Sequence, residues 1–452
     1  MSDLSAVMMT PGGVKSEFMA HTLPPTQSSI ESTRTVEYSP LSALNNNNQT
    51  PLIEFYIPGN AEEYIDLDET FIMVKMSYSS ETTKTTASSS SSGSTSAAPT
   101  TTTSSSAQSD IAPVNNLLHS MFSKVELTLQ NTIINPNSNY YPYRAYIETL
   151  LTHSDEAKKT YLETSGWKTS SSESIDSVSD VRGKKWKLGE EFILYGKLHL
   201  DMSGQDKLIL NGVNLRLSLQ VAPTKFFFVG KSGVKPTVDI KDVKLYVQKK
   251  RATASQGDMV EKSLTKSSAK YCIRRCEMKE FVIASSTTQI TIDNAFSGTL
   301  PSRVILGLVE NEAVSGNIEK NPFNFAHFDL NHASIIVNGE EFPKVAYQPN
   351  FAKKLIQREY FELFHGLGKL NPHPNCGLTE EMYLKGHSLL CFNLTADGSD
   401  SSDGHLNPVK RGTLRIDLKF AKALTAVTSI ILFAEFDGII SIDKDRNPQI
   451  LF

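Results

Sequence analysis

A pattern of alternating apolar and polar residues occurs twice in this chain, about 200 residues apart. An apolar residue takes every second position in Leu215–Val221 and again in Leu414–Phe420, and a glycine, Gly212 or Gly412, stands just before each run. Successive side chains of a strand point to opposite faces, so each run predicts a strand with one buried face. Recurrence near half the chain length indicates a duplicated unit, which constrains the fold more than any other feature.

Further elements recur in the same order in the two halves. Each half carries a predicted strand, then a turn, then a short aromatic helix. In chain order these are Val125–Leu129, Asn135–Pro136 and Tyr143–Glu148, and then Ala333–Val337, Asn338–Gly339 and Tyr360–Phe364. Duplication of a β-sandwich of about 200 residues explains this order with one assumption. The alternative is that alternating strands resemble each other by chance.

Runs of β-branched and aromatic residues predict strands along most of the chain, separated by Asn, Gly, Pro and Asp. Only two short helices are expected, at Tyr143–Leu151 and Lys354–Phe364. Many strands with little helix indicate sandwiches or barrels, so the predicted fold class is all-β. The predicted strands are Ile53–Ile57, Phe71–Tyr78, Lys124–Ile134, Phe192–Leu200, Leu208–Val221, Val238–Gln248, Glu280–Ile292, Ser302–Val309, Ala333–Val337, Leu389–Leu394, Thr413–Phe420 and Ser429–Ile442.

Two segments have too few apolar residues to build a core. Residues 1–50 are rich in Ser, Thr, Pro, Met and Asn, which predicts a flexible N-terminal arm. Residues 79–110 are almost entirely Ser, Thr and Ala, and we interpret them as a disordered insertion in a loop between two strands. The arm is mildly acidic, unlike arms that neutralise packaged nucleic acid.

Composition excludes several classes of protein. The 452 residues suit two or three domains, and a net charge of −4 argues against a nucleic-acid-binding chain. Four cysteines form no disulfide framework in a chain of this length, which favours synthesis in a reducing intracellular compartment. We expect neither a secretory leader nor a membrane span, because no basic segment precedes an apolar run and no long apolar stretch occurs.

Three motifs could bind a ligand, but each departs from the pattern that its chemistry needs. Gly230–Ser232 ends like a phosphate-binding loop, yet Lys225 stands where that loop requires glycine. The acids of Asp397–Gly404 are spaced three apart, unlike an alternating calcium loop, so a solvated turn is expected. A zinc set would need widely separated residues, and free thiols are the simpler reading; its members would be Cys272, Cys276, His373, Cys376 and His387.

The candidates for catalysis are equally weak. The pairs Glu340–Glu341 and Glu380–Glu381 are adjacent residues, which on a strand point to opposite faces and cannot act as an acid and base couple. His387 beside Ser388 shows no further triad pattern. The Tyr140–Tyr143 cluster could stack on sugars or bases, but an aromatic core or subunit contact is the more common use. We therefore predict no catalytic, cofactor-binding or metal-binding residue, no cofactor and no enzyme activity.

Several of these segments resemble viral capsid proteins. Val114–His119, Lys124–Leu129 and Tyr143–Glu148 are similar to a stretch of the first jelly roll of large DNA virus capsid proteins. A closer resemblance, over about residues 35 to 450, is to capsid proteins of Maverick/Polinton elements and adintoviruses. It rests on Pro51–Gly59, Tyr64–Leu67, Gly377–Tyr383, Gly412–Leu424 and Phe433–Asp437. The Ser/Thr insertion after Tyr78 has no counterpart there.

This resemblance implies a double jelly-roll major capsid protein in the adenovirus hexon and tectivirus lineage. We then expect two tandem eight-stranded jelly rolls with short helices in loops: residues 51–230 and 231–452, joined near 223–236. Three copies would form a homotrimer with six similar sandwiches, and such trimers would build an icosahedral shell around double-stranded DNA in the virion. Minor capsid or penton proteins are the expected further partners, without sequence-specific nucleic-acid binding.

Two rival interpretations remain. A carbohydrate-binding or carbohydrate-active β-sandwich protein would carry an aromatic and carboxylate cleft in one half only. A vertex protein of a capsid would need one jelly roll, and this chain is too long for that role. The repeat in both halves and the resemblance of the C-terminal segment favour the major capsid protein.

Overall fold

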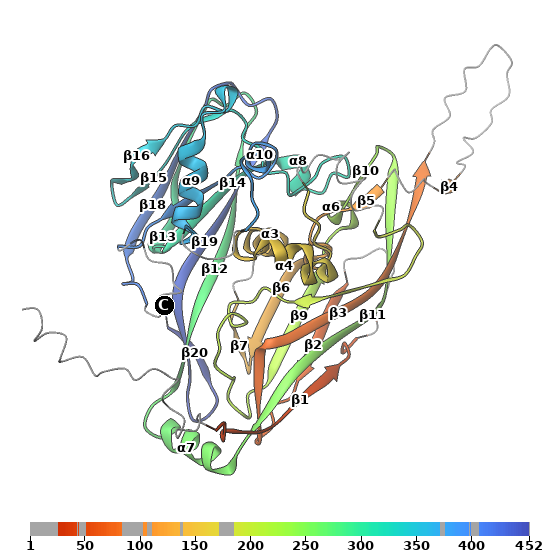
Figure 1. The fold of residues 1–452 in the computed structure, drawn as a ribbon, viewed down its shortest axis with the longest axis vertical. Coiled ribbons are helices and arrows are strands. Elements are labelled where there is room, and N and C mark those ends of the chain that lie inside the picture. Colours follow the sequence, from red (N-terminus) through yellow and green to blue (C-terminus); the bar gives the residue numbers. More distant parts are fainter. Residues whose placement is uncertain are drawn as a thin grey trace, which may run out of the picture.

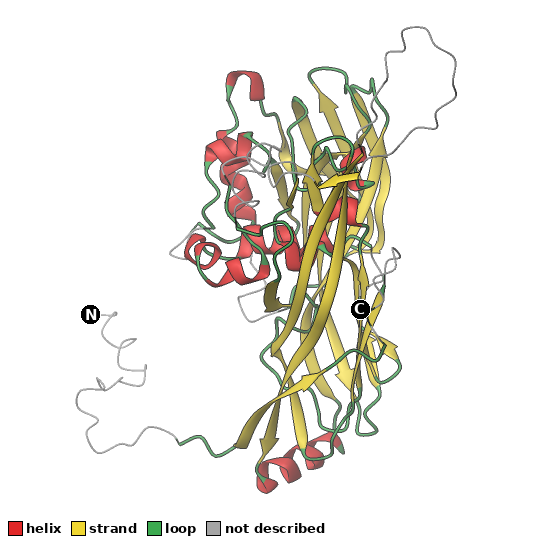
Figure 2. Cartoon of the chain, turned by 90° about the vertical axis from the view of Figure 1, so that its right-hand side faces the viewer, coloured by secondary structure: helices red, strands yellow, loops and turns green. Residues whose placement is uncertain are grey.

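The computed structural model describes residues 26–42, 44, 51–83, 103–105, 111–135, 139–170, 185–370, 376–396, 398 and 406–451. Figure 1 shows two groups of long strands side by side, one formed by each half of the chain. Figure 2 shows most of the helices gathered on one side of the strands and one helix at the far end.

The main strands of the first half lie in one five-stranded and one four-stranded sheet, with four main strands in each. One has the strand order β1-β11-β3-β8, and the other has the order β2-β9-β6-β7. The short strand β4 (Thr103–Ser105) also pairs with β3, and β5 (Ile111–Pro113) and β10 (Phe228–Gly230) form a separate two-stranded sheet. The main strands are β1 (Ile30–Tyr38), β2 (Leu52–Ile57), β3 (Glu63–Thr83), β6 (Phe122–Leu129), β7 (Thr132–Ile133), β8 (Phe192–Lys197), β9 (Leu215–Val221) and β11 (Val234–Ala252).

The second half forms the sheets β12-β19-β14-β17 and β13-β18-β15-β16, and β20 (Pro448–Leu451) pairs with β19. Its main strands are β12 (Ala269–Ile283), β13 (Gln289–Thr299), β14 (Arg303–Glu310), β15 (Leu330–Val337), β16 (Glu340–Tyr347), β17 (Leu389–Asn393), β18 (Arg411–Phe420) and β19 (Thr428–Ile442).

Helices connect the strands. Those of the first half are α2 (Leu117–Ser120), α3 (Tyr141–Thr152), α4 (Asp155–Lys159), η3 (Tyr161–Ser165) and α6 (Thr224–Phe227). Helix α7 (Ala254–Leu264) joins the halves. The second half has α8 (Asn311–Val314), η4 (Phe351–Lys353), α9 (Gln357–Gly366) and α10 (Glu380–Leu384). The predicted helices 143–151 and 354–364 correspond to α3 and α9.

The two halves have the same topology. When the eight main strands of each half are numbered in chain order, one sheet has the order 1-8-3-6 and the other the order 2-7-4-5, in both halves. All of these pairings are antiparallel. Eight antiparallel strands in two facing sheets with this order form a jelly roll. The predicted fold class, a double jelly roll, is confirmed.

The repeated sequence patterns occupy equivalent places. The two alternating runs form β9 and β18, the seventh strand of each half, and the two aromatic helices each follow the fifth strand. The predicted match between the turns Asn135–Pro136 and Asn338–Gly339 is wrong, however. Asn338 and Gly339, with φ of 52° and 89°, connect the fourth and fifth strands, and the equivalent turn of the first half contains Gln130, with φ of 51°, not Asn135. A left-handed turn residue, not the Asn-Pro pair, marks this hairpin.

The predicted domain boundary between residues 230 and 231 is wrong. Strand β11 lies beyond that boundary but pairs with β3 along its length and with β1, so it completes the first sandwich. Residues 223–236 are not a linker, because they form α6, β10 and the start of β11. Alternation identified β11 as a strand, but alternation carries no information about which sheet a strand joins.

Three smaller predictions also need correction. Ile30–Tyr38 belongs to the predicted arm but forms β1, an edge strand paired with β11. Ser79–Thr83, the start of the predicted insertion, continues β3, and its first four residues pair with β11. The predicted strand Glu280–Ile292 is interrupted by a turn at Ser286, with φ of 65°, and belongs to β12 and β13. The remainder of the arm and of the insertion lies largely outside the described residues.

The core of each sandwich follows from alternation. On β18 the side chains of Leu414, Ile416 and Leu418 are buried, whereas Arg415 is exposed and Asp417 is half-buried. Strand β19 is buried at every position from Thr428 to Phe436, as predicted for a strand covered on both faces. One face of β19 meets the opposite sheet, where Phe436 packs on Phe296 of β13. The other face meets the first half.

Candidate assembly interface

A cluster of aromatic side chains packs between the two halves and stabilises their contact. Helix α3 begins next to Pro142, whose fixed φ suits a first helical turn, and it directs Tyr143 and Tyr146 toward the second half. Phe323, which is fully buried, stacks on Tyr146 with ring centroids 4.4 Å apart and lies 5.6 Å from Tyr143. Phe226 of α6 completes the group, 6.2 Å from Phe323. Burial of several aromatic rings makes the two sandwiches one body.

A chain of ionisable side chains of the first half extends to the same interface. His199 Nδ1 lies 2.6 Å from Glu148 Oε2, and Arg144 donates to Glu148 Oε1 at 2.8 Å. Arg144 also pairs with Asp201 at 2.6 Å, and Asp201 accepts the backbone N–H of Cys276 on β12 at 3.3 Å. The two carboxylates neutralise the Arg144 guanidinium, which is almost fully removed from water. Without these partners the buried charge would destabilise the fold.

Burial and neighbouring charges together set the protonation of this cluster and of His119, whose ring centroid lies 4.7 Å from that of His199. Burial lowers the pKa of His119 well below the ordinary value, and the neighbouring His199 lowers this pKa further. Burial alone would raise the pKa of Glu148, but Arg144 and His199 outweigh burial and hold this pKa at about 2. Near neutral pH, therefore, His119 is uncharged while Glu148 is ionised and pairs with Arg144.

Polar contacts continue the interface along the strands. Tyr271 of β12 donates to the carbonyl of Leu208 at 3.0 Å, and Arg446 Nε donates to the carbonyl of Asn211 at 2.8 Å. At the level of α3, Tyr140 donates to Glu280 of β12 at 2.7 Å. The Tyr140–Tyr143 cluster is thus part of the contact between the halves, which is the more common use expected for it.

The motifs considered for ligand binding are not assembled into sites. Gly230 ends β10, and the next element is strand β11, where a phosphate-binding loop needs a helix. Cys272 is exposed and Cys276 is buried on β12, whereas Cys376 and His387 line a small cavity elsewhere with Lys158 and Trp167. Among the described residues no three His, Cys, Asp or Glu side chains are placed to hold a metal ion. Residues 397 and 399–404 and His373 lie outside the described residues.

The candidate catalytic groups have other partners. The side chains of Glu340, Glu341, Glu380 and Glu381 are exposed on β16 and α10. Glu381 pairs with Lys385 at 2.6 Å. Ser388 is buried and donates to the carbonyl of Tyr383 at 2.6 Å, so its hydroxyl is directed at the backbone and not at His387.

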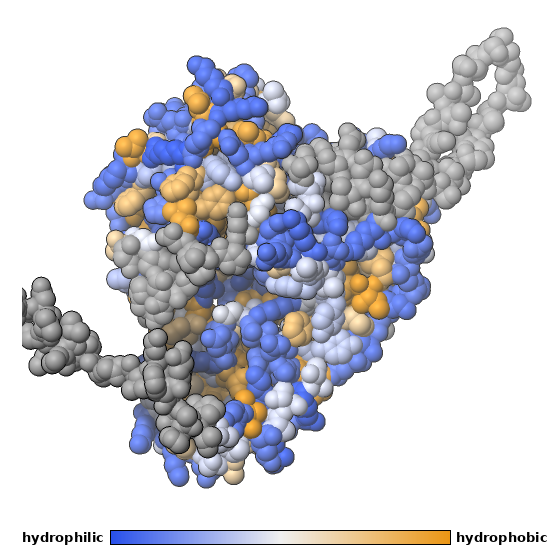
Figure 3. All heavy atoms as spheres, in the orientation of Figure 1, coloured by the Kyte–Doolittle hydropathy of each residue, from blue (hydrophilic) through white to orange (hydrophobic). Residues whose placement is uncertain are grey.

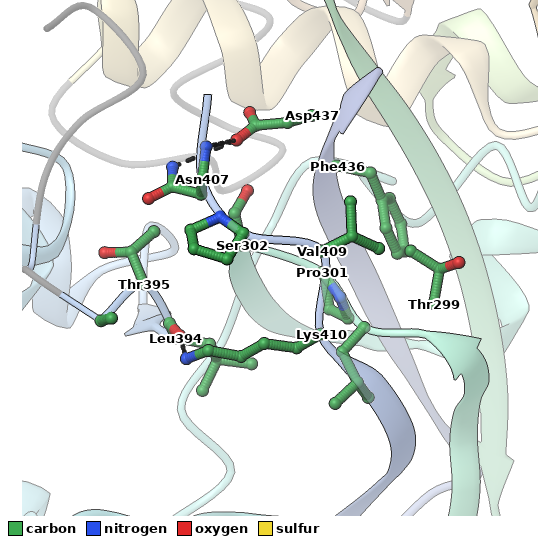
Figure 4. Close-up of a pocket in the computed structure, with 13 residues that line it drawn as sticks. Thr299, Pro301, Ser302, Leu394, Thr395, Asn407, Val409, Lys410, Phe436 and Asp437 are labelled. Atoms are coloured by element: carbon green, nitrogen blue, oxygen red, sulfur yellow. Dashed lines mark hydrogen bonds between the residues drawn. The ribbon is translucent and has the colours of Figure 1, made fainter. Parts of the chain in front are cut away.

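A pocket in the second half lies beside the start of β18 (Figure 4). Its carboxylate, Asp437, accepts hydrogen bonds from the backbone and side-chain amides of Asn407, at 2.9 and 3.1 Å. Its lysine, Lys410, donates to the carbonyl of Leu394 at 2.7 Å. One aromatic ring, Phe436, lines the pocket. These groups stabilise the loop and provide no second carboxylate for glycoside chemistry.

Sequence reasoning missed the ionisable cluster. Arg144 and Glu148 are four residues apart on a predicted helix, a spacing that favours an ion pair and is visible in the sequence. His199 and Asp201 come from a loop more than 50 residues later, and no local pattern links them to α3.

Among the described residues no helix is long and apolar enough to cross a membrane.

The geometry defines the chain as a double jelly roll whose halves share one buried interface. This is the fold of viral major capsid proteins. The chain is similar to a structure from the Sputnik virophage, with 9% identity, a TM-score of 0.64 and coverage of 98% of this chain and 93% of that chain. For the Faustovirus major capsid protein the values are 9%, 0.60, 98% and 94%, and for the mavirus major capsid protein they are 11%, 0.56, 98% and 95%.

Comparison of sequences adds one relative. An uncharacterized protein of Caenorhabditis elegans is 23% identical over 402 residues, which cover 87% of this chain and 92% of the relative. No family model matches the chain.

Proposed function

We propose that the chain is the major capsid protein of a double-stranded DNA virus or virus-like element. Three copies form a trimer with a pseudo-hexagonal outline, and trimers build an icosahedral shell around the DNA. The observation that supports this most is the identical strand order of the two halves. A threefold assembly of duplicated sandwiches presents six similar units, which allows near-sixfold packing from one kind of chain.

The internal interface supports the same role. Because aromatic contacts and hydrogen bonds hold the sandwiches as one body, each copy can contribute both to one rigid block. The trimer should bury well over about 2,000 Å² of surface in total, as permanent assemblies do. The interface between copies, and not a pocket, is then the functional site, and the protein is not an enzyme.

The expected partners follow from this role. The N-terminal residues ahead of β1 would tie neighbouring trimers or bind minor capsid and penton proteins, and would gain order on assembly. The net charge of −4 gives the chain no overall attraction to DNA phosphates, and we expect no sequence-specific binding of nucleic acid. The protein would be made in the host cytoplasm and reside in the virion.

Expression of the full chain followed by electron microscopy tests the proposal. We expect particles with a hexagonal outline and, at high concentration or with co-expressed minor proteins, closed shells that protect DNA from nuclease. If only particles the size of one copy of the chain were seen under all conditions, the result would contradict a capsid role.

The carbohydrate-binding alternative predicts a cleft in one half only, and no described contact favours it. Titration with a panel of oligosaccharides separates the two proposals. Binding at micromolar concentration by a chain that does not assemble would favour the alternative.

A further inference from the structure

The outer faces of two equivalent sheets are covered very differently. In the second half, the outward residues of β12-β19-β14-β17 include Ile305, Ile431 and Phe433, all buried. The first half covers much of this face, because Tyr140 reaches Glu280 and Asp201 reaches the backbone of Cys276 on β12. The sheet with the 1-8-3-6 order in the second half is therefore sealed, over β12 and β19 by the first half and over β14 and β17 by Phe325 and α9 of its own half.

The same sheet of the first half, β1-β11-β3-β8, carries an apolar group on its outer face, beside the ion pairs of Lys75 and Lys244, and no described segment covers this group. Ile193 and Tyr195 of the edge strand β8 are 56% and 37% exposed. Phe71 stacks on Tyr195 with ring centroids 5.6 Å apart, Tyr246 lies 6.0 Å from Tyr195, and Tyr246 donates to the sulfur of Met73. We call these five residues the β8 patch. An apolar group continuous across three strands is typical of a contact surface.

The second half exposes a matching group around α9. Helix α3, which covers the sealed sheet, follows the fifth strand of the first half, and α9 follows the fifth strand of the second. Phe361 on α9 and Leu355 just before it are 54% and 58% exposed. Arg358 donates to the carbonyl of Val345 at 2.6 Å, which holds α9 beside the exposed Val345 of β16. We call Val345, Leu355 and Phe361 the α9 patch.

Alignment of the two helices strengthens the equivalence. When Tyr143 is matched with Tyr360, Phe361 takes the position of Arg144, whose partner Asp201 accepts the backbone N–H of Cys276 in the second half. Figure 3 shows hydrophobic residues at the surface over α9 and again at the right-hand side, over the first half. Figure 1 places α9 on one side of the molecule and strands β3 and β11 on the other.

We propose that the β8 patch of one copy packs against the α9 patch of the next copy, repeating between copies the contact that joins the halves within one chain. The two patches differ, so the contact is head-to-tail, and such contacts close into a ring when the rotation between copies allows it. This inference rests on the proposed trimer, and it assigns the surfaces that form it. The occupant of each patch is a second copy of this chain.

Surface variants test the assignment. Ile193→Ser with Tyr195→Ser alters the β8 patch, and Phe361→Ser alters the α9 patch, while Met259→Ser on α7 is a control of similar exposure away from both. We expect each patch variant to raise the trimer dissociation constant at least tenfold, with far-UV circular dichroism unchanged, because apolar anchors dominate interfaces. The control should dissociate like the wild type. Patch variants that also dissociate like the wild type would overturn the assignment.

Cross-linking tests the pairing itself. In a Cys272→Ser background, which removes the exposed thiol, Tyr195→Cys with Phe361→Cys should give covalent dimers and trimers with a short bismaleimide, whereas either single variant should give none. Covalent dimers from Tyr195→Cys alone would mean that the β8 patch meets itself, and the head-to-tail contact would be wrong. A wild type that is monomeric at every concentration would overturn the proposed function as well, whereas trimers that resist every patch variant would overturn only this inference.

Discussion

Leu418 and Lys419 are neighbours on β18 that face opposite sides of the sheet. The side chain of Leu418 is fully buried between the sheets, and that of Lys419 is half-buried on the outer face. We expect Leu418→Asp to destabilise the fold by at least about 3 kcal/mol, because the carboxylate would be buried without a partner. Lys419→Ala should cost less than about 0.5 kcal/mol.

Soluble yield and urea unfolding measure this contrast. The two variants serve as controls for each other, because a slip of one residue in register would exchange their effects. Equal stability of the two variants would refute the assignment of β18.

His119, which is buried beside Tyr141 and His199, makes the stability of the fold depend on pH. Burial lowers the pKa of this side chain well below its value of about 6.5 in an unfolded chain. Below that pH the unfolded state takes up a proton that the folded state refuses, so the free energy of unfolding falls as pH decreases. His153, whose pKa burial lowers to about 4, acts in the same direction.

We expect the free energy of unfolding to fall by roughly 1–2 kcal/mol for each such histidine between pH 7 and pH 5. Urea unfolding at several pH values measures it, and His119→Gln should have a smaller slope than the wild type. An equal slope in the variant would show that His119 does not sense pH.

At the scale of elements, local patterns identified strands well and their partners poorly. Strands β18 and β19 were predicted because alternation and continuous apolarity are local properties. Strand β1 was missed because its Ser, Thr and Glu residues have no apolar face, and its structure depends on pairing with β11, more than 200 residues away. The sequence therefore indicated the sandwiches but not the boundary between them.

The Ser/Thr segment allows a prediction about an element. Since β3 extends to Thr83 and β4 begins at Thr103, a deletion should remove only residues 84–102 and join the ends with a short Gly-Ser linker. The segment has too few apolar residues to contribute to the core, so we expect the melting temperature to change by less than about 2 °C. Differential scanning calorimetry measures this, and loss of soluble protein would mean that the segment is structural.

At the scale of the whole molecule, duplication explains both the topology and the uneven coverage of the sheets. The repeat and the jelly-roll fold were predictable, because they follow from patterns about 200 residues apart. The interface between the halves was not, because Phe323 and Tyr146, or Asp201 and Cys276, meet only in the folded chain. The first sandwich covers part of the β12-β19-β14-β17 sheet of the second. The equivalent sheet of the first sandwich, β1-β11-β3-β8, is the one that we propose to contact another copy.

The mass of the purified chain in solution tests this account most directly. Multi-angle light scattering across a hundredfold range of concentration should give about 150 kDa, three times the chain mass of 49.9 kDa. A concentration-independent mass near 50 kDa, or a strict dimer near 100 kDa, would contradict a trimeric capsid building block.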